Sequence, residues 1–286
     1  MTEKNKTMDG TLYLVATPIG NLSDLSPRAQ KVLSEVSFIA AEDTRNTRAL
    51  LTHFEIHKEL VSYHEHNKIS RGPELVARLL AGESCALVTD AGMPAISDPG
   101  EDLVRLCADA GITVSCIPGG TAAITALALS ALPTGRFAFE GFLPADKKER
   151  RARISALINE ERTTILYEAP HRLKKTLAEL KEALGERKIS LCRELTKLNE
   201  EITRTTLSGA IAIFDTQEPR GEFVLILEGG AKKEEPCVAD AMTPAEHVAL
   251  YEAQGLSRMD AIKAAARERG VPKSVLYKEL QTDDSE

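Results

Sequence analysis

The stretch Ala86-Leu-Val-Thr-Asp-Ala-Gly-Met-Pro-Ala-Ile-Ser-Asp-Pro-Gly100 decides the fold class of this chain. It opens in the short apolar run Cys85–Val88, which is typical of a parallel strand buried on both faces. A loop rich in Gly, Pro and Asp follows, and then a helix-like run from Glu101 to Ala110. Open α/β sheets bind their ligands at loops that follow the carboxyl ends of parallel strands. The stretch therefore indicates either a ligand-binding loop or a stiff structural turn.

Apolar runs alternate with helix-like segments from residue 11 to residue 230. Short connections between a strand, a helix and the next strand predict a parallel sheet with helices on both faces. A second α/β unit follows, and its pattern allows a mixed sheet. The Ala-rich helix expected over 121–132 is apolar all round, so we expect it to be buried between the two units. The expected strands are 11–16, 38–41, 60–63, 85–89, 113–117, 137–139, 164–167, 189–193, 203–207 and 223–227.

The chain of 286 residues is longer than one compact core usually needs. We expect an N-terminal α/β domain over 11–122 and a second α/β domain over 123–230, with a ligand cleft between them. Residues 231–242 have the composition of a linker. Three helix signals follow over 243–286, the first of them a capping box with Thr243 and Glu246. They predict a small helical tail that resembles a helix-turn-helix.

The overall charge excludes a generally basic nucleic-acid binder. The formal net charge is −7, and the contents of 43% hydrophobic and 28% charged residues are those of a soluble globular protein. The five cysteines form no C-x-x-C pair, and the N-terminus lacks the apolar segment of a signal peptide. The longest run of small apolar residues, 122–132, is too short to span a bilayer. We therefore expect a cytoplasmic protein without a membrane segment.

Several common site motifs are absent from the sequence. It contains no P-loop, no G-x-G-x-x-G after the first strand and no G-x-S-x-G elbow. These absences argue against a P-loop NTPase, a dinucleotide-binding domain and an α/β-hydrolase. His53 and His57 lack the glutamate of a zinc-binding helix, and His64 and His66 lack a set of cysteine partners. The sequence therefore predicts no metal site.

Polar loops follow the strands of both units. Because carboxyl ends of parallel strands meet at one edge of a sheet, the first five loops should gather there. Polar strand exits of the second unit would close a cleft against that edge. The loops are Thr17–Asn21, Glu42–Arg48, His64–Asn67, Asp90–Gly100 and Pro118–Thr121 in the first unit, with Gly141–Pro144 and Glu168–Arg172 in the second.

Seven segments in order resemble the ribosomal RNA small subunit methyltransferase I family. This family is the cytidine-2'-O-methyltransferase branch of the tetrapyrrole methylase-like superfamily, and the resemblance covers about residues 11–230 together with the helical tail. The segments are Thr17-Pro-Ile-Gly-Asn-Leu22, Asp24-Leu-Ser-Pro-Arg28, Ala41-Glu-Asp-Thr-Arg45, Thr89–Gly100, Phe139-Glu-Gly-Phe-Leu-Pro144, Tyr167-Glu-Ala-Pro-His-Arg172 and Cys192-Arg-Glu-Leu-Thr196.

The resemblance implies two α/β domains with S-adenosyl-L-methionine bound between them in a folded conformation. It also implies 2'-O-methylation of a cytidine ribose in small-subunit (16S) ribosomal RNA, with the free RNA or the assembled 30S subunit as partner, and it implies a homodimer. Carried over by position, the cofactor-binding residues are Gly92, Met93, Pro94, Ile96, Thr121, Ala122, Tyr167 and Ala210.

A ribose hydroxyl is a poor nucleophile at neutral pH, so a base or a polarising group should lie near it. Four carboxylates are candidates, although Asp43 suits a helix N-cap equally well and Asp90 suits loop support. A run of basic residues on one expected helix is the best phosphate-binding patch in the chain, and a solvated helix face is its plain alternative. The catalytic candidates are Glu42, Asp43, Asp90 and Glu168, and the RNA-binding candidates are Asn21, Arg45, Lys147, Lys148, Arg150, Arg151 and Arg172.

Two other functions remain open at this point. A methylase of a small tetrapyrrole precursor would share the fold, but it predicts neither the basic patch nor the tail. The first loop, Thr17-Pro-Ile-Gly-Asn21, is not glycine-rich, and Ala91-Gly-Met-Pro94 replaces the Gly-Asp-Pro motif of tetrapyrrole-modifying members. A non-catalytic regulator that binds nucleic acid through the tail would leave the polar loops as ordinary turns.

Overall fold

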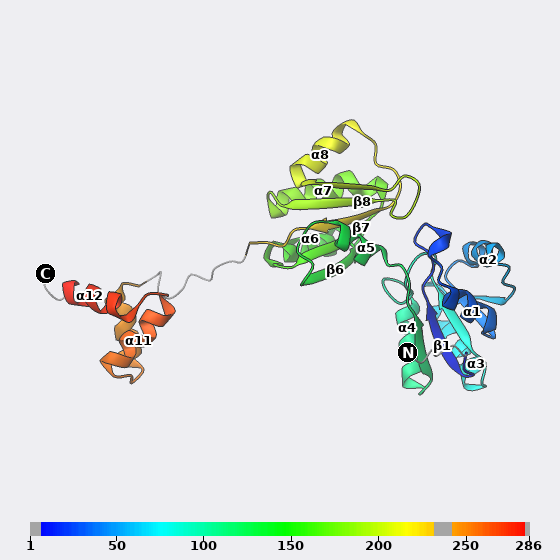
Figure 1. Ribbon diagram of the computed structural model, residues 1–286, viewed down its shortest axis with the longest axis horizontal. Helices are drawn as coiled ribbons and strands as arrows, with labels where there is room; N and C mark the ends of the chain where they lie inside the picture. The colour runs from blue at the N-terminus through cyan, green and yellow to red at the C-terminus, as the bar shows by residue number, and fades with distance from the viewer. Residues whose placement is uncertain (1–6, 232–241, 284–286) are drawn as a thin grey trace. The chain divides into compact units, whose positions relative to one another are not determined.

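The computed structural model describes residues 7–231 and 242–283, and the side chains up to residue 280. The chain divides into two compact units, residues 1–230 and 231–286 (Figure 1). Most of the linker expected over 231–242 lies outside the described residues. No helix within the described part combines the length and the apolar composition that a membrane crossing requires.

The first sheet is parallel throughout, with the strand order β3-β2-β4-β1-β5. Successive residues of β4 alternate between two hydrophobic clusters, so this strand is buried on both faces as its apolar sequence predicts. Helices α1 and α2 cover one face, and α3 and α4 cover the other. The elements are β1 (Thr11–Val15), the 3-10 helix η1 (Leu22–Asp24), α1 (Pro27–Glu35), β2 (Phe38–Ala41), α2 (Thr44–His53), β3 (Glu59–Ser62), α3 (Lys68–Leu80), β4 (Cys85–Val88), α4 (Gly100–Asp109) and β5 (Thr113–Ile117).

The second sheet is mixed, with the order β6-β7-β10-β8-β9. Strands β6 and β7 are parallel, and all other neighbours are antiparallel. Helices α6, α7 and α8 pack on one face, whereas α5 packs on the other face against β7 and β10. The elements are α5 (Ala122–Leu129), β6 (Phe137–Phe142), α6 (Lys147–Ala156), the 3-10 helix η2 (Leu157–Asn159), β7 (Thr163–Glu168), α7 (Pro170–Leu184), β8 (Lys188–Arg193), β9 (Glu201–Thr206), α8 (Leu207–Thr216) and β10 (Phe223–Leu227).

Two elements differ in length from the sequence-based expectation. Helix α5 ends at Leu129 rather than residue 132, because the Ser130 hydroxyl donates to the Leu127 carbonyl and Ala131 adopts a positive φ of 61°. Strand β6 continues to Phe142 instead of ending at residue 139. A bulge between Phe139 and Gly141, where Gly141 has a φ of 63°, lets the strand bend and continue.

The C-terminal unit is a bundle of three helices, α10 (Pro244–Ala253), α11 (Arg258–Glu268) and α12 (Lys273–Asp283). Its first helix begins with the predicted capping box, in which Thr243 and Glu246 exchange side-chain and backbone hydrogen bonds. The buried His247 ring lies between Glu268 and Arg269, at 3.1 Å from each. Small and aliphatic side chains from all three helices form the core of the C-terminal unit.

Candidate functional site

Two backbone hydrogen bonds join the first strand exit to the loop after β4. The Thr17 N–H donates to the Gly92 carbonyl at 2.9 Å, and the Gly92 N–H donates to the Thr17 carbonyl at 3.1 Å. Gly92 takes a φ of 84°, and a Cβ there would lie 3.2 Å from Cγ2 of Ile19. A side chain at this position would be strained and crowded, so glycine permits the close approach.

A chain of side-chain hydrogen bonds connects three strand exits at the same edge. The Thr17 hydroxyl donates to the Thr89 carbonyl at 3.1 Å, and the Thr89 hydroxyl donates to Oε2 of Glu42 at 2.9 Å. Beside them, Nδ2 of Asn46 donates to Oδ2 of Asp90 at 3.1 Å. The parallel topology therefore brings Glu42 and the Thr89-Asp90 exit to the same edge of the sheet, as the strand-exit pattern predicts.

A pocket of about 330 Å³ opens between the first loop and α2. Its volume is at the lower end of the range for small-ligand sites, roughly 300–1,000 Å³. Polar groups and small apolar side chains both line it, which is typical of a binding site for a small organic group. The lining residues are Thr17, Pro18, Gly20, Leu22, Asn46, Thr47, Ala49, Leu50, Thr89 and Asp90.

The loop from Met93 to Gly100 is held in one shape by Asp98. The Asp98 carboxylate accepts hydrogen bonds from the backbone N–H groups of Ala95 at 3.0 Å, Ile96 at 3.2 Å and Gly100 at 2.7 Å. Two non-glycine residues of the loop, Ala95 and Ser97, have positive φ values of 68° and 65°. Such strain concentrates at ligand sites and persists only where the surroundings enforce it.

The loop carries two apolar side chains, Met93 and Ile96, and the start of α5 provides further candidates for cofactor contact. Ile96 is 53% exposed although it is apolar, and Met93 lies with its sulfur 3.9 Å from the Cys116 thiol. Thr121 is the residue before α5, and Ala122 begins that helix. The backbone of Ala123 hydrogen-bonds to the Tyr167 hydroxyl, and burial raises the pKa of this phenol.

Aromatic rings frame Tyr167 on the second sheet. The ring of Phe139 is 5.3 Å from that of Tyr167, and the ring of Phe142 is 5.4 Å from it. Phe142 is exposed, and it stands in the Phe139–Pro144 segment, although only Tyr167 of these three rings is a candidate predicted from the sequence. These rings give the site an apolar wall beside the start of α5.

The first loop also contacts the second half of the unit. A Cβ on Gly20 would lie 2.5 Å from Cγ of Lys197 and 2.9 Å from the Leu195 carbonyl. The side chain of Ile19 packs into the cluster that α5 forms with the second sheet. The loop Thr17–Asn21 therefore bridges the two sheets, and a larger residue at Gly20 would displace Lys197.

Asp43 and Arg45 form a local pair at the start of α2. Asp43 is the N-cap, accepts the Arg45 N–H at 2.8 Å and binds the Arg45 guanidinium at 2.7 and 3.1 Å. The Arg45 hydrogen bonds lower the Asp43 pKa to about 2. A carboxylate with this pKa is a weak proton acceptor, so the structure favours the capping interpretation. Arg45 itself is exposed.

Glu168 differs from the expectation for a catalytic carboxylate, because it is buried among structural partners. Its Oε1 accepts the Ala169 N–H at 3.0 Å and lies 3.3 Å from Nε of Arg172, while its Oε2 accepts the Thr176 hydroxyl at 2.5 Å. Arg150 completes the cluster with Nη2 at 3.9 Å from Oε2. Such partners compensate for the cost of burying a carboxylate.

Arg150 and Arg172 also differ from their expected role in RNA binding. Arg150 is only 5% exposed, and its guanidinium donates to Glu179 and Thr176, both at 2.6 Å. Arg172 binds Glu168 and donates to the Leu143 carbonyl at 2.5 Å. Internal carboxylates and carbonyls occupy both cations, so neither is presented to a phosphate.

The other basic candidates are exposed on α6. Lys147, Lys148 and Arg151 all lie at the surface, on a helix whose N-cap is Asp146. Asn21 is exposed as well, and its side chain caps η1 by accepting the Ser23 N–H at 3.1 Å. The structure therefore keeps three cations of the basic run together and gives Asn21 a local capping bond.

Ala210 is separated from the other cofactor candidates. It is fully buried in the cluster that α6, α7 and α8 form on one face of the second sheet. Tyr167 packs with α5 on the opposite face. The periodicity of α8 predicts burial but not the face of the sheet that the helix covers, so this separation could not be predicted from the sequence.

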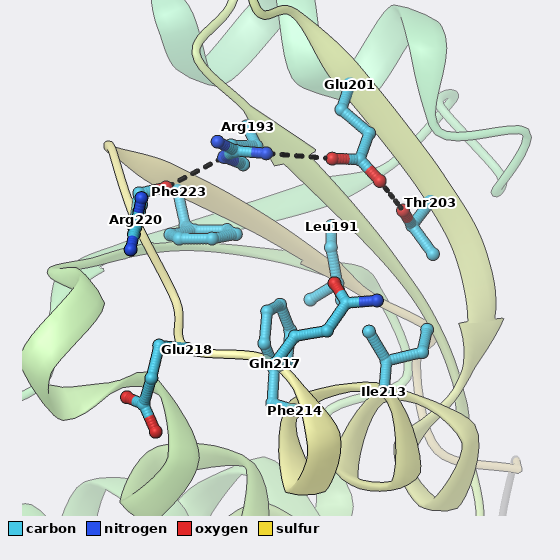
Figure 2. A pocket seen from close by; sticks show the side chains of 10 residues that line it. All are labelled: Leu191, Arg193, Glu201, Thr203, Ile213, Phe214, Gln217, Glu218, Arg220 and Phe223. Atoms are coloured by element: carbon cyan, nitrogen blue, oxygen red, sulfur yellow. Dashed lines mark hydrogen bonds and ion pairs between the residues drawn. The ribbon is translucent and has the colours of Figure 1, made fainter.

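A smaller pocket of about 70 Å³ lies between α8 and the ends of β8 and β9 (Figure 2). Arg193 binds Oε2 of Glu201 at 3.0 Å and donates to the Arg220 carbonyl at 2.7 Å. The volume suits a few water molecules.

Among residues 7–231 and 242–283, no three His, Cys, Asp or Glu side chains form a group able to hold a metal ion.

Asn46 and Thr89 line the pocket, although neither is among the candidate site residues predicted from the sequence. Both stand in predicted strand exits, Asn46 within Glu42–Arg48 and Thr89 next to Asp90. The available signal was the convergence of parallel strand ends, which implies that any polar residue there faces the same edge.

Sequence comparisons identify relatives along almost the whole chain. The model of the Tetrapyrrole (Corrin/Porphyrin) Methylases matches residues 11–211. The chain is 51% identical over 270 residues to ribosomal RNA small subunit methyltransferase I of Halalkalibacterium halodurans, which covers 94% of this chain and 93% of the relative. It is 46% identical over 280 residues to the protein of the same name from Bacillus subtilis, with coverages of 97% and 96%.

Solved structures with this fold include enzymes of different substrates. Uroporphyrin-III C-methyltransferase from Thermus thermophilus, complexed with S-adenyl homocysteine, has a TM-score of 0.53 and 20% identity and covers 76% of this chain and 97% of its own. A diphthine synthase has a TM-score of 0.56 and 12% identity, with coverages of 76% and 89%. At such identities the likeness concerns the fold, and the fold does not decide the substrate.

The buried cluster around Glu168 yields a stability prediction. Glu168→Ala should lower the free energy of unfolding by about 2–4 kcal/mol, because it leaves the Thr176 hydroxyl and the Ala169 N–H without their buried acceptor and removes one of the two carboxylates beside Arg150. The expected fall in Tm is roughly 2–4 °C per kcal/mol, measured by calorimetry or circular dichroism. Glu218→Ala is the control, since the Glu218 side chain is 79% exposed in its ion pair with Lys174. A Glu168→Ala protein with the wild-type Tm would contradict the structural role.

Proposed function

Because the chain belongs to the tetrapyrrole methylase family, and within it to the ribosomal RNA small subunit methyltransferase I branch, we propose that it methylates the 2'-hydroxyl of a cytidine in small-subunit ribosomal RNA. The observation that carries the proposal is the edge at Thr17 and Gly92. Thr17 lines a pocket of about 330 Å³, and a strained, preorganised loop continues along the chain from Gly92. Transfer between two bound groups needs two adjoining sites of this kind.

S-adenosylmethionine is the proposed cofactor, and when bound it supplies a methyl group on a positively charged sulfur. The residues at the edge fit such a molecule, because Asp98 fixes the loop that carries Gly92, Met93, Pro94 and Ile96. The exposed Ile96 offers an apolar contact, and the Tyr167 wall lies by Thr121 and Ala122. Ala210 is left out of this set because it is buried on the far face of the sheet.

Glu42 is the carboxylate that we assign to proton removal. Asp43 is a cap with a low pKa and Glu168 is buried, so only Glu42 and Asp90 of the four candidates remain at the edge. Glu42 accepts the Thr89 hydroxyl, and Thr89 lines the pocket. The proton of the ribose hydroxyl would pass to Glu42 directly or through the Thr89 hydroxyl, which leaves the ribose oxygen as the nucleophile.

Phosphate contacts belong to the exposed cations of α6 and to Arg45. Lys147, Lys148 and Arg151 provide three positive charges within two turns of one helix. Arg45 stands at the start of α2, which also lines the pocket. Contacts of this kind fix the position of the RNA without reading its sequence.

The same proposal includes the partner and the assembly. The RNA would be bound as the 30S subunit or as its free 16S RNA, in the cytoplasm, by a homodimer of the chain. A tetrapyrrole substrate is disfavoured because the relatives that are 46–51% identical are named for ribosomal RNA, whereas the porphyrin methylase shares only 20% of its residues. A role limited to binding is disfavoured by the same names. Light scattering of the purified protein tests the homodimer.

Labelled S-adenosylmethionine tests the reaction itself. Incubation with 30S subunits from a strain without this enzyme should place the label on one cytidine ribose of 16S RNA. Gly92→Ala should weaken cofactor affinity in calorimetry by about tenfold or more, because the residue needs a positive φ beside Ile19. Gly111→Ala is matched, with a φ of 70° and open space around it, and should bind normally. A protein preparation that binds the cofactor but labels neither 30S subunits nor free 16S RNA would refute the proposal.

The assignment of Glu42 predicts a loss in the chemical step. Glu42→Gln should lower kcat by about 10²–10⁴-fold, because the amide cannot take a proton, while cofactor affinity stays the same. Single-turnover kinetics with 30S subunits measures the effect. Glu74→Gln, on the exposed face of α3, is the control. A Glu42→Gln enzyme with normal kcat would assign proton removal elsewhere.

The patch on α6 predicts a change in salt dependence. The triple change of Lys147, Lys148 and Arg151 to Ala should weaken RNA binding and lower the slope of log affinity against log salt by about 2, since each phosphate contact contributes roughly 0.7–0.9. Filter binding at several salt concentrations measures it. A triple Ala variant of Lys31, Lys175 and Lys188 has the same net charge with the changes scattered over the surface. Equal slopes for the two variants would rule out the patch.

A further inference from the structure

The pocket between the first loop and α2 has a polar end and an apolar body. Asn46 and Asp90 stand together at the polar end, joined by the hydrogen bond from Nδ2 to Oδ2 at 3.1 Å. Pro18, Leu22 and Leu50 supply apolar surface, and Leu22 is 41% exposed. This combination suits a flat ring that carries hydrogen-bonding groups on one edge.

We infer that this pocket takes the cytosine base of the target nucleotide, and that Asn46 and Asp90 read its hydrogen-bonding edge. The inference rests on the proposed function, because it concerns the base of the nucleotide whose ribose is methylated. It makes Asn46 and Asp90 determinants of base specificity, whereas proton removal is assigned to Glu42.

The chemistry of the two side chains matches cytosine and not uracil. Cytosine presents an amino donor at N4 and acceptors at N3 and O2, whereas uracil presents an acceptor at O4 and a donor at N3. A carboxylate only accepts hydrogen bonds, so Asp90 suits the N4 amino group and repels the uracil oxygen. The Asn46 amide nitrogen donates to N3 in the cytosine arrangement.

The existing hydrogen bond leaves both residues capacity for this contact. The Asn46 amide nitrogen carries two hydrogens, one of which already serves Oδ2 of Asp90. The second hydrogen can donate to the base while Oδ1 of Asp90 accepts from N4. The pair therefore needs no rearrangement when the base enters, which reduces the cost of binding.

Regular elements hold both readers in place. Asn46 lies in the first turn of α2, whose N-cap Asp43 fixes the start of the helix. Asp90 stands two residues after β4 ends at Val88, and the intervening Thr89 is bonded to Thr17 and Glu42. Such a site can enforce the directional contacts on which base discrimination depends.

A base can enter this pocket only when it is out of its stack. RNA-binding proteins read sequence mainly on single-stranded or splayed-out nucleotides, because the grooves of an A-form helix hide the base edges. Enzymes that modify a nucleotide commonly extrude it into a pocket for the same reason. Leu22, which lines the pocket, is 41% exposed, and Asp90 is exposed as well, so the pocket is open to a base that comes from the RNA surface.

Exchange of the target base tests the assignment of the readers. The probe is a set of 30S subunits with either cytidine or uridine at the position that the wild-type enzyme labels. Asp90→Asn should reduce the preference for cytidine by about 10–100-fold, because its amide can donate to the uracil O4. Asn46→Ala should reduce the same preference by removing the donor to N3.

Asp109→Asn is the charge-matched control, because Asp109 ends α4 at the surface. Unchanged cytidine preference in both pocket variants, with normal transfer by the wild type, would overturn the inference and leave the proposed function intact. If Asp90→Asn is inactive on both bases and Asn46→Ala keeps the wild-type preference, the inference also fails and Asp90 belongs to the chemistry. Absence of transfer by the wild type would instead reject the proposed function.

Discussion

The pair of backbone hydrogen bonds between Thr17 and Gly92 is the constraint on which the functional edge depends. It locks the exit of β1 to the loop after β4, at a place where only a glycine tolerates both the positive φ and the contact with Ile19. The pocket lies on the α2 side of this junction, and the strained loop continues beyond Gly92. The first loop also touches Leu195 and Lys197, so the same junction links the two sheets. A shift here would disturb both proposed binding regions together.

The carboxylates of the unit show how surroundings decide chemistry. Glu168 is enclosed by cations and hydroxyls, and Asp43 is held in a cap with a pKa of about 2. Glu42 and Asp90 keep neutral partners, a threonine hydroxyl and an asparagine amide. Glu42, Asp43 and Asp90 follow strands and Glu168 is the last residue of one, so position in the sequence does not separate them. Only their partners do, and those come from α6, α7, α2 and the loop after β4.

Much of the fold could be predicted because periodicity and strand exits are local signals. The apolar runs indicated the strands, and the parallel topology brings Thr17, Glu42 and the Thr89-Asp90 exit to one edge of the sheet. It is harder to predict which face of a helix is buried. In the basic run of α6, Arg150 and Ile154 lie four residues apart and share the buried face, which the charge count concealed. The assignment of Ala210 to the cofactor site has a related problem. The periodicity of its helix predicts that the residue is buried, but not which face of the sheet the helix covers.

The negative net charge of −7 has a consequence for how this chain can select RNA. Non-specific affinity grows with the number of phosphates that cations neutralise, and here the exposed cations of the patch are few. Phosphate contacts position the RNA but carry no sequence information. Selection must therefore come from groups that meet a base, and aromatic residues for stacking form only 4% of the chain. A hydrogen-bonding pocket at the end of a buried strand provides that selection without a strongly basic surface. The wrong base would leave donors and acceptors of the pocket unpaired, and this cost does not depend on the total charge of the protein.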